Sequence, residues 1–118
     1  MNKELPEIIK DIFKEPDSRI WKGIWLDTLN SLLDDGRMIL VWTEFIELVK
    51  NNHKYYKNMS LEQYIKWECK ALVAKVIKLK DTRYDEKFFI KSIKDYLSKK
   101  EINLTLDMIK TIYDATNS

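Results

Sequence analysis

The sequence has little of what disulfide scaffolds, β-folds and most metal sites require. It contains two glycines, two prolines, one cysteine and one histidine in 118 residues. A single cysteine excludes an internal disulfide and a multi-thiolate zinc site. The scarcity of glycine and proline leaves few of the turn residues that β-hairpins need, and no long stretch alternates polar and apolar residues. The composition therefore favours helices.

The chain also lacks a long uncharged segment. Residues 1–13 interleave charges with apolar side chains, whereas a secretory signal places its charges before an unbroken apolar stretch. The longest uncharged runs, such as Met38–Thr43, fall far below the roughly 20 residues that cross a bilayer. We therefore expect a cytoplasmic protein without a transmembrane segment.

What the chain does have is enough apolar material for one core. Hydrophobic residues make up 45%, and four tryptophans, six tyrosines and four phenylalanines are spread along the sequence. A length of 118 residues is common for one domain. We predict a single all-α domain over residues 1–118, a helical bundle of about five to six helices with a long central helix at residues 60–80.

The first two predicted helices are bounded by proline and a capping residue. Pro6 suits a first helical turn, and Pro16 ends that short segment. Asp17 or Ser18 then caps a second helix. One side of this helix carries a 3.6-residue stripe of Trp21, Trp25, Leu29 and Leu32. Tryptophans on such a stripe indicate core residues.

A third helix is predicted after the turn at residues 34–36. From Met38 onward, one face carries Met38, Trp42, Phe45, Ile46 and Val49. Because residues 38–42 form a short apolar run that periodicity alone does not resolve, a strand there is the competing interpretation. A polar loop follows at residues 51–59.

The central helix is predicted from a capping-box pattern, Ser60 with Gln63. Its main buried stripe comprises Leu61, Ile65, Cys69, Leu72, Val76 and Leu79. Trp67 lies on a second face, and Val73 with Ile77 on a third. The middle of this helix is therefore apolar nearly all round.

Two further helices follow, each with a predicted cap. Asp85 precedes a helix with Phe89, Ile93, Tyr96 and Leu97 on one side. Thr105 precedes a short last helix, with Leu104 and Ile109 spaced as a hydrophobic staple. This pair also allows interpretation as a helix-turn-helix, in which Asp107, Lys110, Thr111 and Asp114 would face the DNA groove.

Candidate catalytic groups are few. His53 lies in a predicted loop, where we expect it to be exposed or locally hydrogen-bonded, and Cys69 lies on a buried stripe, where a thiol acts as a small hydrophobe. The HExxH, P-loop and GxGxxG motifs are absent. We predict no enzyme, with no catalytic, metal or cofactor residues. A hydrolase using the carboxylate pairs Glu44–Glu47 or Asp34–Asp35 is a third interpretation.

Positive charge is concentrated in the second half of the chain. Residues 65–100 carry eleven Lys or Arg against five Asp or Glu, a net charge of +6, whereas residues 1–59 carry a net charge of −1. The predicted basic belt comprises Lys66, Lys70, Lys80, Lys87, Lys91 and Lys94. It either binds nucleic acid or a nucleoprotein, as an inhibitor or small subunit of a nucleic-acid-targeting defence complex would, or is ordinary solvated surface.

The apolar surplus of the central helix supports the preferred interpretation. A bundle this small has difficulty burying three apolar faces, so we expect either Trp67 or the strip of Val73 and Ile77 to stay partly exposed and to bind a protein partner, unless the first and last helices cover it. Lys, Ile and Asn supply 39 of the 118 residues, a bias typical of AT-rich coding sequence. We therefore expect an inhibitor, immunity factor or small subunit encoded by a phage or mobile element, with a homodimer as a further option.

Overall fold

Five α-helices and one 3₁₀ turn make up the regular secondary structure of the part described by the structure, a computed structural model covering residue 11, residues 23–82 and residues 85–117. The elements are α2 (Ile24–Asp34), α3 (Met38–Asn52), η1 (His53–Tyr55), α4 (Leu61–Asp81), α5 (Glu86–Lys99) and α6 (Leu106–Asn117). The predicted all-α class is confirmed. The alternative strand at residues 38–42 is wrong, because these residues form the first turns of α3 and bury one helical face.

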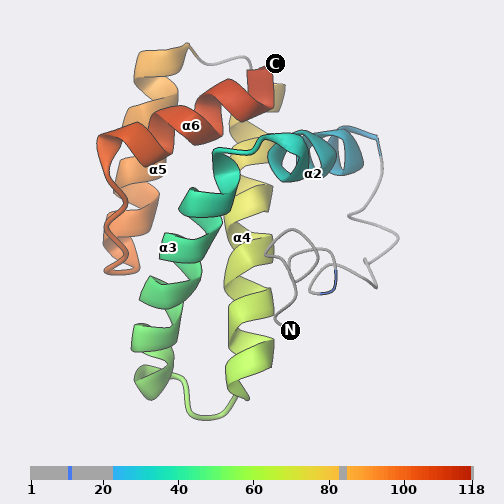
Figure 1. The fold of residues 1–118 in the computed structure, drawn as a ribbon. Coiled ribbons are helices and arrows are strands. Elements are labelled where there is room, and N and C mark those ends of the chain that lie inside the picture. The colour runs from blue at the N-terminus through green and yellow to red at the C-terminus, as the bar shows by residue number, and fades with distance from the viewer. Residues whose placement is uncertain (1–10, 12–22, 83–84, 118) are drawn as a thin grey trace.

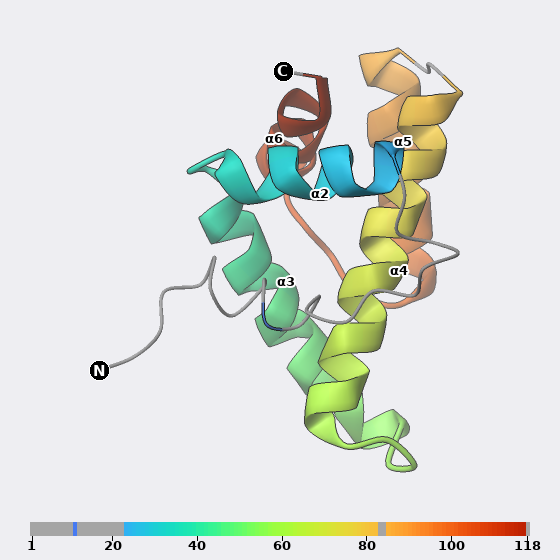
Figure 2. The ribbon, with the colours of Figure 1, turned by 90° about the vertical axis from the view of Figure 1, so that its right-hand side faces the viewer.

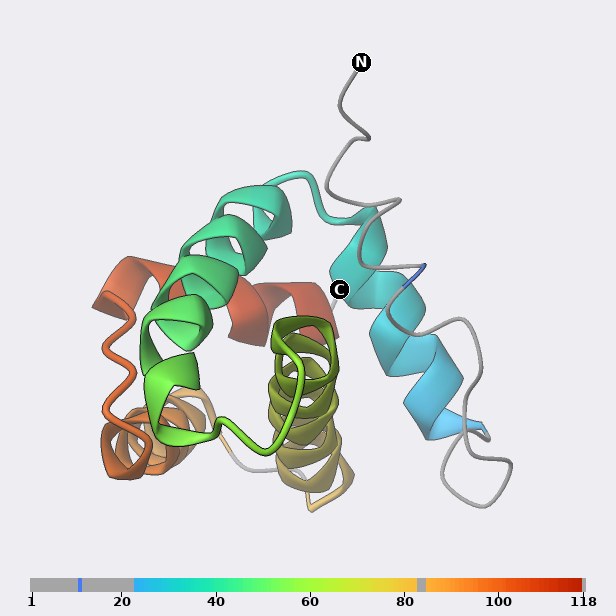
Figure 3. The same cartoon turned by 90° about the horizontal axis from the view of Figure 1, so that it is seen from below.

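The long helices α3 and α4 form an antiparallel hairpin that organises the fold (Figure 1). Helix α2 crosses over the upper part of this hairpin, as the turned view shows (Figure 2). Seen from below, α5 and α2 lie on opposite sides of α4 (Figure 3). Helix α6 contacts α2, α3, α4 and α5 and closes one end of the bundle.

The core is a single cluster of buried side chains from all five helices. Trp25 and Trp42 are both buried, which confirms their predicted place in the core. The third predicted core tryptophan, Trp21, lies outside the described residues, as does the predicted first helix at residues 6–16. Leu61 was expected at the start of the buried stripe of α4 but is exposed. It is the first residue of α4 and lies at the end of the hairpin where the loop connects α3 to α4.

Three helices begin at the residues that the sequence predicts. In each case a side-chain oxygen at the N-cap accepts a hydrogen bond from the backbone N–H three residues later, which satisfies one of the unpaired donors of the first turn. The three bonds are Gln63 N to Ser60 Oγ at 3.1 Å, Phe88 N to Asp85 Oδ1 at 2.8 Å and Met108 N to Thr105 Oγ1 at 3.2 Å.

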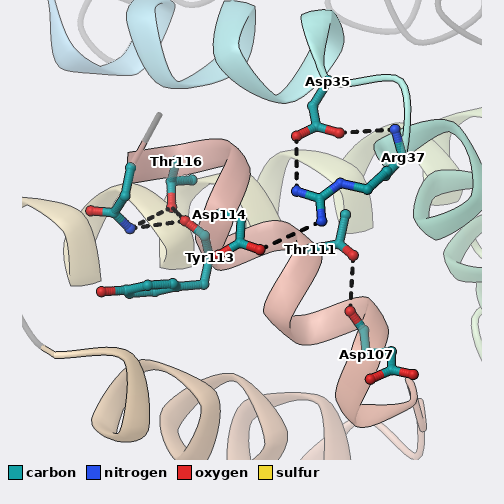
Figure 4. Close-up of polar contacts among 8 residues, drawn as sticks. Asp35, Arg37, Asp107, Thr111, Tyr113, Asp114 and Thr116 are labelled. Carbon is teal, nitrogen blue, oxygen red and sulfur yellow. Dashed lines mark hydrogen bonds and ion pairs between the residues drawn. The ribbon is translucent and has the colours of Figure 1, made fainter.

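A polar contact links the α2–α3 turn to α6 (Figure 4). The Arg37 backbone N–H donates to Asp35 Oδ1 at 2.8 Å, and the Arg37 guanidinium lies 3.4 Å from Asp35 and 3.5 Å from Asp114. The Thr111 hydroxyl donates to the backbone carbonyl of Asp107. Exposed ion pairs of this kind contribute little stability, so α6 is held mainly by its buried face.

Helix α5 ends in a Schellman motif with an unusual residue in the left-handed position. The Ile102 N–H donates to Leu97 O at 2.9 Å, and the Glu101 N–H donates to Ser98 O at 3.0 Å. Glu101 has a φ of 59°, a conformation that glycine adopts without the steric cost of a Cβ atom.

Replacing Glu101 with Gly is therefore expected to raise the free energy of unfolding by about 1 kcal/mol, since it relieves the left-handed strain at the helix end. Urea unfolding followed by circular dichroism measures this. Glu101→Ala is the matched control, because it removes the carboxylate but keeps the strain. Equal stability of the Gly and Ala variants would show that the left-handed conformation carries no cost.

Candidate interaction surface

An aromatic cluster lies at the end of the α3–α4 hairpin, where η1 joins the two helices. The rings of Tyr56 and Tyr64 are stacked with centroids 4.9 Å apart, and the Trp67 ring lies 6.2 Å from Tyr64 and 6.4 Å from Tyr56. His53 adds a fourth ring 5.7 Å from Tyr64. Tyr64 is buried at the base, whereas Tyr56 and Trp67 are exposed. We call these four residues the aromatic cluster.

His53 has a positioning role within this cluster. Its Nε2 atom donates to the backbone carbonyl of Met59 at 2.7 Å, which ties η1 to the loop before α4. Because a carbonyl oxygen only accepts, Nε2 carries the proton in this arrangement. The imidazole is half-buried, and this matches the locally hydrogen-bonded histidine that the sequence predicts.

A buried ion pair lies beside the cluster. Glu68 is only 2% exposed, and Lys100 Nζ donates to Glu68 Oε1 at 2.8 Å. The same Nζ atom lies 5.1 Å from the Trp67 ring centroid and 5.2 Å from that of Tyr96, within the range of cation–π attraction. Lys100 thereby links the carboxylate of α4 to two aromatic rings. Sequence reasoning missed this pair, although a carboxylate next to Cys69 on the buried side of α4 was a signal for it.

The titration of these groups follows from their burial and contacts. Burial alone would lower the pKa of Lys100, but the hydrogen bond to Glu68 and the charges of Tyr96 and Glu68 outweigh it and raise the pKa above its usual 10.5. Burial, with the nearby Glu68 and Tyr56, raises the pKa of Tyr64 to about 12. Both groups hold a proton more tightly in the folded protein than in the unfolded chain.

Stability is therefore expected to fall above pH 10. A raised pKa in the folded state means that the stabilisation is complete below the unfolded pKa, 10.0 for Tyr64 and 10.5 for Lys100, and is lost as pH rises through the folded value. Urea unfolding at a series of pH values from 8 to 12 measures this. Tyr64→Phe, which keeps the ring, should lose less stability than the wild type over this range. Identical pH profiles would mean that Tyr64 titrates as an ordinary tyrosine.

A shallow pocket of about 320 Å³ adjoins the aromatic cluster. It lies between the end of α3 and the end of α5, which are joined where Asn52 Nδ2 donates to the backbone carbonyl of Lys100 at 3.0 Å. The lining residues are Asn52, Tyr55, Tyr56, Lys99, Lys100 and Glu101. Tyr55 is 65% exposed at its edge. The aromatic cluster and this pocket together form what we call the interaction surface.

The predicted partner-binding residues do not form one exposed strip. Trp67 is 46% exposed and belongs to the aromatic cluster, but Val73 is fully buried and Ile77 is partly buried against the core. The prediction that Val73 is exposed is wrong, because α2, α3 and α6 all pack against α4 and enclose that face. Of the three predicted residues, only Trp67 is exposed.

The predicted basic belt is likewise divided. Lys87, Lys91 and Lys94 are exposed along α5, whereas Lys66, Lys70 and Lys80 are only half-exposed on α4. Two α4 residues mark the side of that helix that faces α5. Glu68 pairs with Lys100, the residue after α5, and Lys75 Nζ lies 6.0 Å from the Tyr96 ring centroid. Lys66 and Lys70 lie roughly 140–180° around the helix from these two residues, so the two lysine rows face different directions.

The other candidate groups have structural roles. Cys69 is fully buried, and burial together with Glu68 raises the pKa of its thiol, so it stays protonated. Asp35 accepts a hydrogen bond from the Arg37 backbone N–H in the turn before α3, and Glu47 pairs with Lys50 at 3.2 Å on the solvated side of that helix. The two exposed carboxylates of α6, Asp107 and Asp114, would oppose a negative DNA backbone.

The described residues hold neither a cluster of metal ligands nor a membrane-spanning helix. Among them no group of three or more His, Cys, Asp or Glu side chains is placed to hold a metal ion. None of the helices within residues 23–82 and 85–117 combines the length and the apolar character that a bilayer crossing needs. No known protein family, curated protein sequence or solved structure matches the chain.

Proposed function

We propose that this protein acts without catalysis, by binding another protein through the interaction surface, with Trp67 as the anchor. Tryptophan and tyrosine are the residues most enriched among those that dominate binding energy in protein interfaces. Here Trp67, Tyr55 and Tyr56 place three large exposed rings on one end of a small bundle. A small protein with such a surface is suited to act as an inhibitor, an immunity factor or a small subunit. We propose that it is encoded by a phage or mobile element.

The observation that carries the proposal is that Trp67 is exposed and yet held in place. Its ring contacts Tyr56 and Tyr64 on one side, and the Lys100 ammonium lies 5.1 Å from its centroid. Lys100 is in turn fixed by the buried carboxylate of Glu68. Binding therefore loses little side-chain entropy at the anchor, which leaves more of the contact energy as affinity.

The test compares Trp67→Ala with a matched variant elsewhere on the surface. Leu106→Ala serves as the control, because Leu106 is 47% exposed on α6, close to the 46% of Trp67. Tagged chains capture partners from the native host, and the affinity for the identified protein is measured. We expect Trp67→Ala to weaken that affinity about thirtyfold or more and to cost about 1 kcal/mol of stability at most. Leu106→Ala should leave the affinity unchanged.

Two outcomes would reject the proposal. If Trp67→Ala loses several kcal/mol of stability, the residue supports the core and not a partner. If affinity and stability both match the wild type, the anchor is not Trp67. In that case Tyr55 and Tyr56, at the edge of the pocket, are the next residues to replace.

A second candidate function is nucleic-acid or nucleoprotein binding through α5. The specific observation is the row of Lys87, Lys91 and Lys94, all exposed and none ion-paired within the described part of the chain. If the row binds nucleic acid, the logarithm of the wild-type binding constant for duplex DNA should fall with the logarithm of the salt concentration, with a slope of roughly 0.9 per phosphate neutralised. Replacing the three lysines with Glu should abolish retention on heparin and on duplex DNA. Unchanged retention would leave this row as solvated surface.

A further inference from the structure

The pocket at the end of the hairpin takes its lining from two segments of different chemistry. Tyr55 and Tyr56 follow the end of α3 and supply aromatic rings, and Lys99 and Lys100 end α5 and supply ammonium groups. The hydrogen bond from Asn52 Nδ2 to the Lys100 carbonyl joins the two segments at 3.0 Å. The volume of about 320 Å³ falls at the small end of the range for pockets that bind small molecules. The pocket therefore has room for a ligand with an aromatic part and an anionic part.

The aromatic lining is the exposed end of a ring stack. Tyr64 is buried, and the Tyr56 ring stacks on it with centroids 4.9 Å apart and planes 18° apart. Tyr56 is 47% exposed and lines the pocket, so the stack ends there. Because Tyr64 covers one face of the Tyr56 ring, a further flat ring continues the stack on the other face. Nucleobases bind to exposed aromatic side chains in this way, since every base has a π face.

Ammonium groups lie beside the end of this stack. Lys99 is exposed in the lining and makes no ion pair within the described residues. Lys54 Nζ lies 5.0 Å from the Tyr55 ring centroid, which places a second ammonium next to the tyrosine lining. Along the chain, residues 50–60 contain three lysines and no Asp or Glu. The local charge at this end of the hairpin therefore favours an anion.

The lining distinguishes between possible occupants. An acidic side chain of a protein would use the lysines and leave the Tyr56 ring uncovered, and an aromatic side chain would cover the ring and leave Lys99 without a counter-charge. A nucleotide joins a flat base to a phosphate and satisfies both. Glu101 is the carboxylate of the lining, and it disfavours a second phosphate but accepts a hydrogen bond from the amino group of a base.

We infer that this pocket binds one nucleotide, with its base stacked on Tyr56 and its phosphate beside Lys99 and Lys54. A free mononucleotide and one unit of a single-stranded nucleic acid present the same chemistry to the pocket. A duplex does not, because its bases are already stacked on one another. The inference goes beyond the proposed function and does not rest on it, since the pocket lining does not include Trp67.

The test is isothermal titration calorimetry of the full chain with adenosine monophosphate, at up to about 10 mM so that weak complexes are detected. Adenosine and ribose 5-phosphate each supply one half of this ligand. We expect each half to bind about tenfold more weakly than the whole, because it contacts only one segment of the lining. A single strand of about ten adenine nucleotides, compared with its duplex, shows whether the site takes a free nucleotide or a nucleic-acid chain.

Substitutions assign the binding to this pocket. Tyr56→Leu removes the flat ring and should weaken adenosine monophosphate binding about tenfold, within the range for base–aromatic stacking, whereas Tyr56→Phe should bind like the wild type. Lys99→Ala should weaken adenosine monophosphate binding about fivefold and leave adenosine binding unchanged, because only the phosphate contacts the lysine. Lys110→Ala, an exposed lysine on α6, is the control and should change neither.

Binding of the mononucleotide or of the single strand that falls in both Tyr56→Leu and Lys99→Ala supports the inference. Absence of binding by every probe overturns it, as does binding that survives both substitutions. Equal binding of duplex and single strand also overturns it, because it would assign the nucleic acid to the lysine row of α5. If Tyr56→Leu fails to fold by circular dichroism, the exposed Lys99→Ala decides between these results. All are measured on the purified chain, so they leave the capture of a protein through Trp67 as a separate question.

Discussion

Replacing Lys100 with Met is expected to lower the free energy of unfolding by about 3 kcal/mol, toward the low end of the range for a broken buried ion pair. The reason is the position of Glu68, which is 2% exposed and whose carboxylate accepts from Lys100 Nζ at 2.8 Å. Without the lysine, a buried carboxylate has lost its counter-charge. The Lys100 side chain itself is 26% exposed, so water reaches the site in part and limits the loss.

The two halves of this pair should behave differently. Glu68→Gln leaves a lysine that turns toward solvent, and we expect it to cost less than Lys100→Met. The double variant, Glu68→Gln with Lys100→Met, should recover much of the loss because no buried charge remains. Urea unfolding of the four proteins completes the double-mutant cycle. A loss below about 1 kcal/mol for Lys100→Met would place the pair among ordinary surface salt bridges.

Trp25→Ala is expected to cost about 3 to 5 kcal/mol, a large part of the stability of a domain this size. Trp25 is 3% exposed and belongs to the single core cluster. Truncating a buried aromatic removes apolar contact area and leaves a cavity that the surrounding helices fill only in part.

The matched control for Trp25→Ala is Trp67→Ala, which removes the same side chain from the surface. Thermal and urea unfolding of the two variants should separate them by at least about 2 kcal/mol. A Trp25→Ala protein that melts within a degree or two of the wild type would show that α2 contributes little to the core.

The start of each later helix could be predicted from the sequence, because the signals are local. Ser60, Asp85 and Thr105 each accept a hydrogen bond from a backbone N–H only three residues away. A short stretch of sequence is therefore enough to predict where each of these helices begins. The core tryptophans could be predicted for a similar reason, since a helical stripe depends on neighbours within a few turns.

The exposure of α4 could not be predicted in this way. Val73 and Trp67 both lie off the main apolar stripe, yet one is fully buried and the other 46% exposed. What separates them is the placement of α2, α3 and α6 against α4, and this depends on tertiary crossings that helical periodicity does not encode. The sequence offered either Trp67 or the strip of Val73 and Ile77 as the exposed part of α4, and of these Trp67 is exposed whereas Val73 is buried.

The candidate site also depends on long-range contacts. Glu68 and Lys100 are 32 residues apart in the sequence, and Asn52 and Lys100 are 48 apart, so no local pattern indicates either contact. The pocket exists only because α5 returns alongside the α3–α4 hairpin. The ring stack of Tyr56, Tyr64 and Trp67 has the same origin, since η1 brings the loop tyrosine back over the first turns of α4.

The central claim is that Trp67 marks the surface that other proteins contact, and photo-crosslinking tests it most directly. A photoreactive phenylalanine analogue is placed at position 67 and, in a separate chain, at position 106, and each chain is irradiated in the native host. The account predicts a protein crosslink from position 67 and none from position 106, with the mass of the product showing whether the partner is a second copy or a different protein. No crosslink from position 67, or equal crosslinking from both positions, would contradict it.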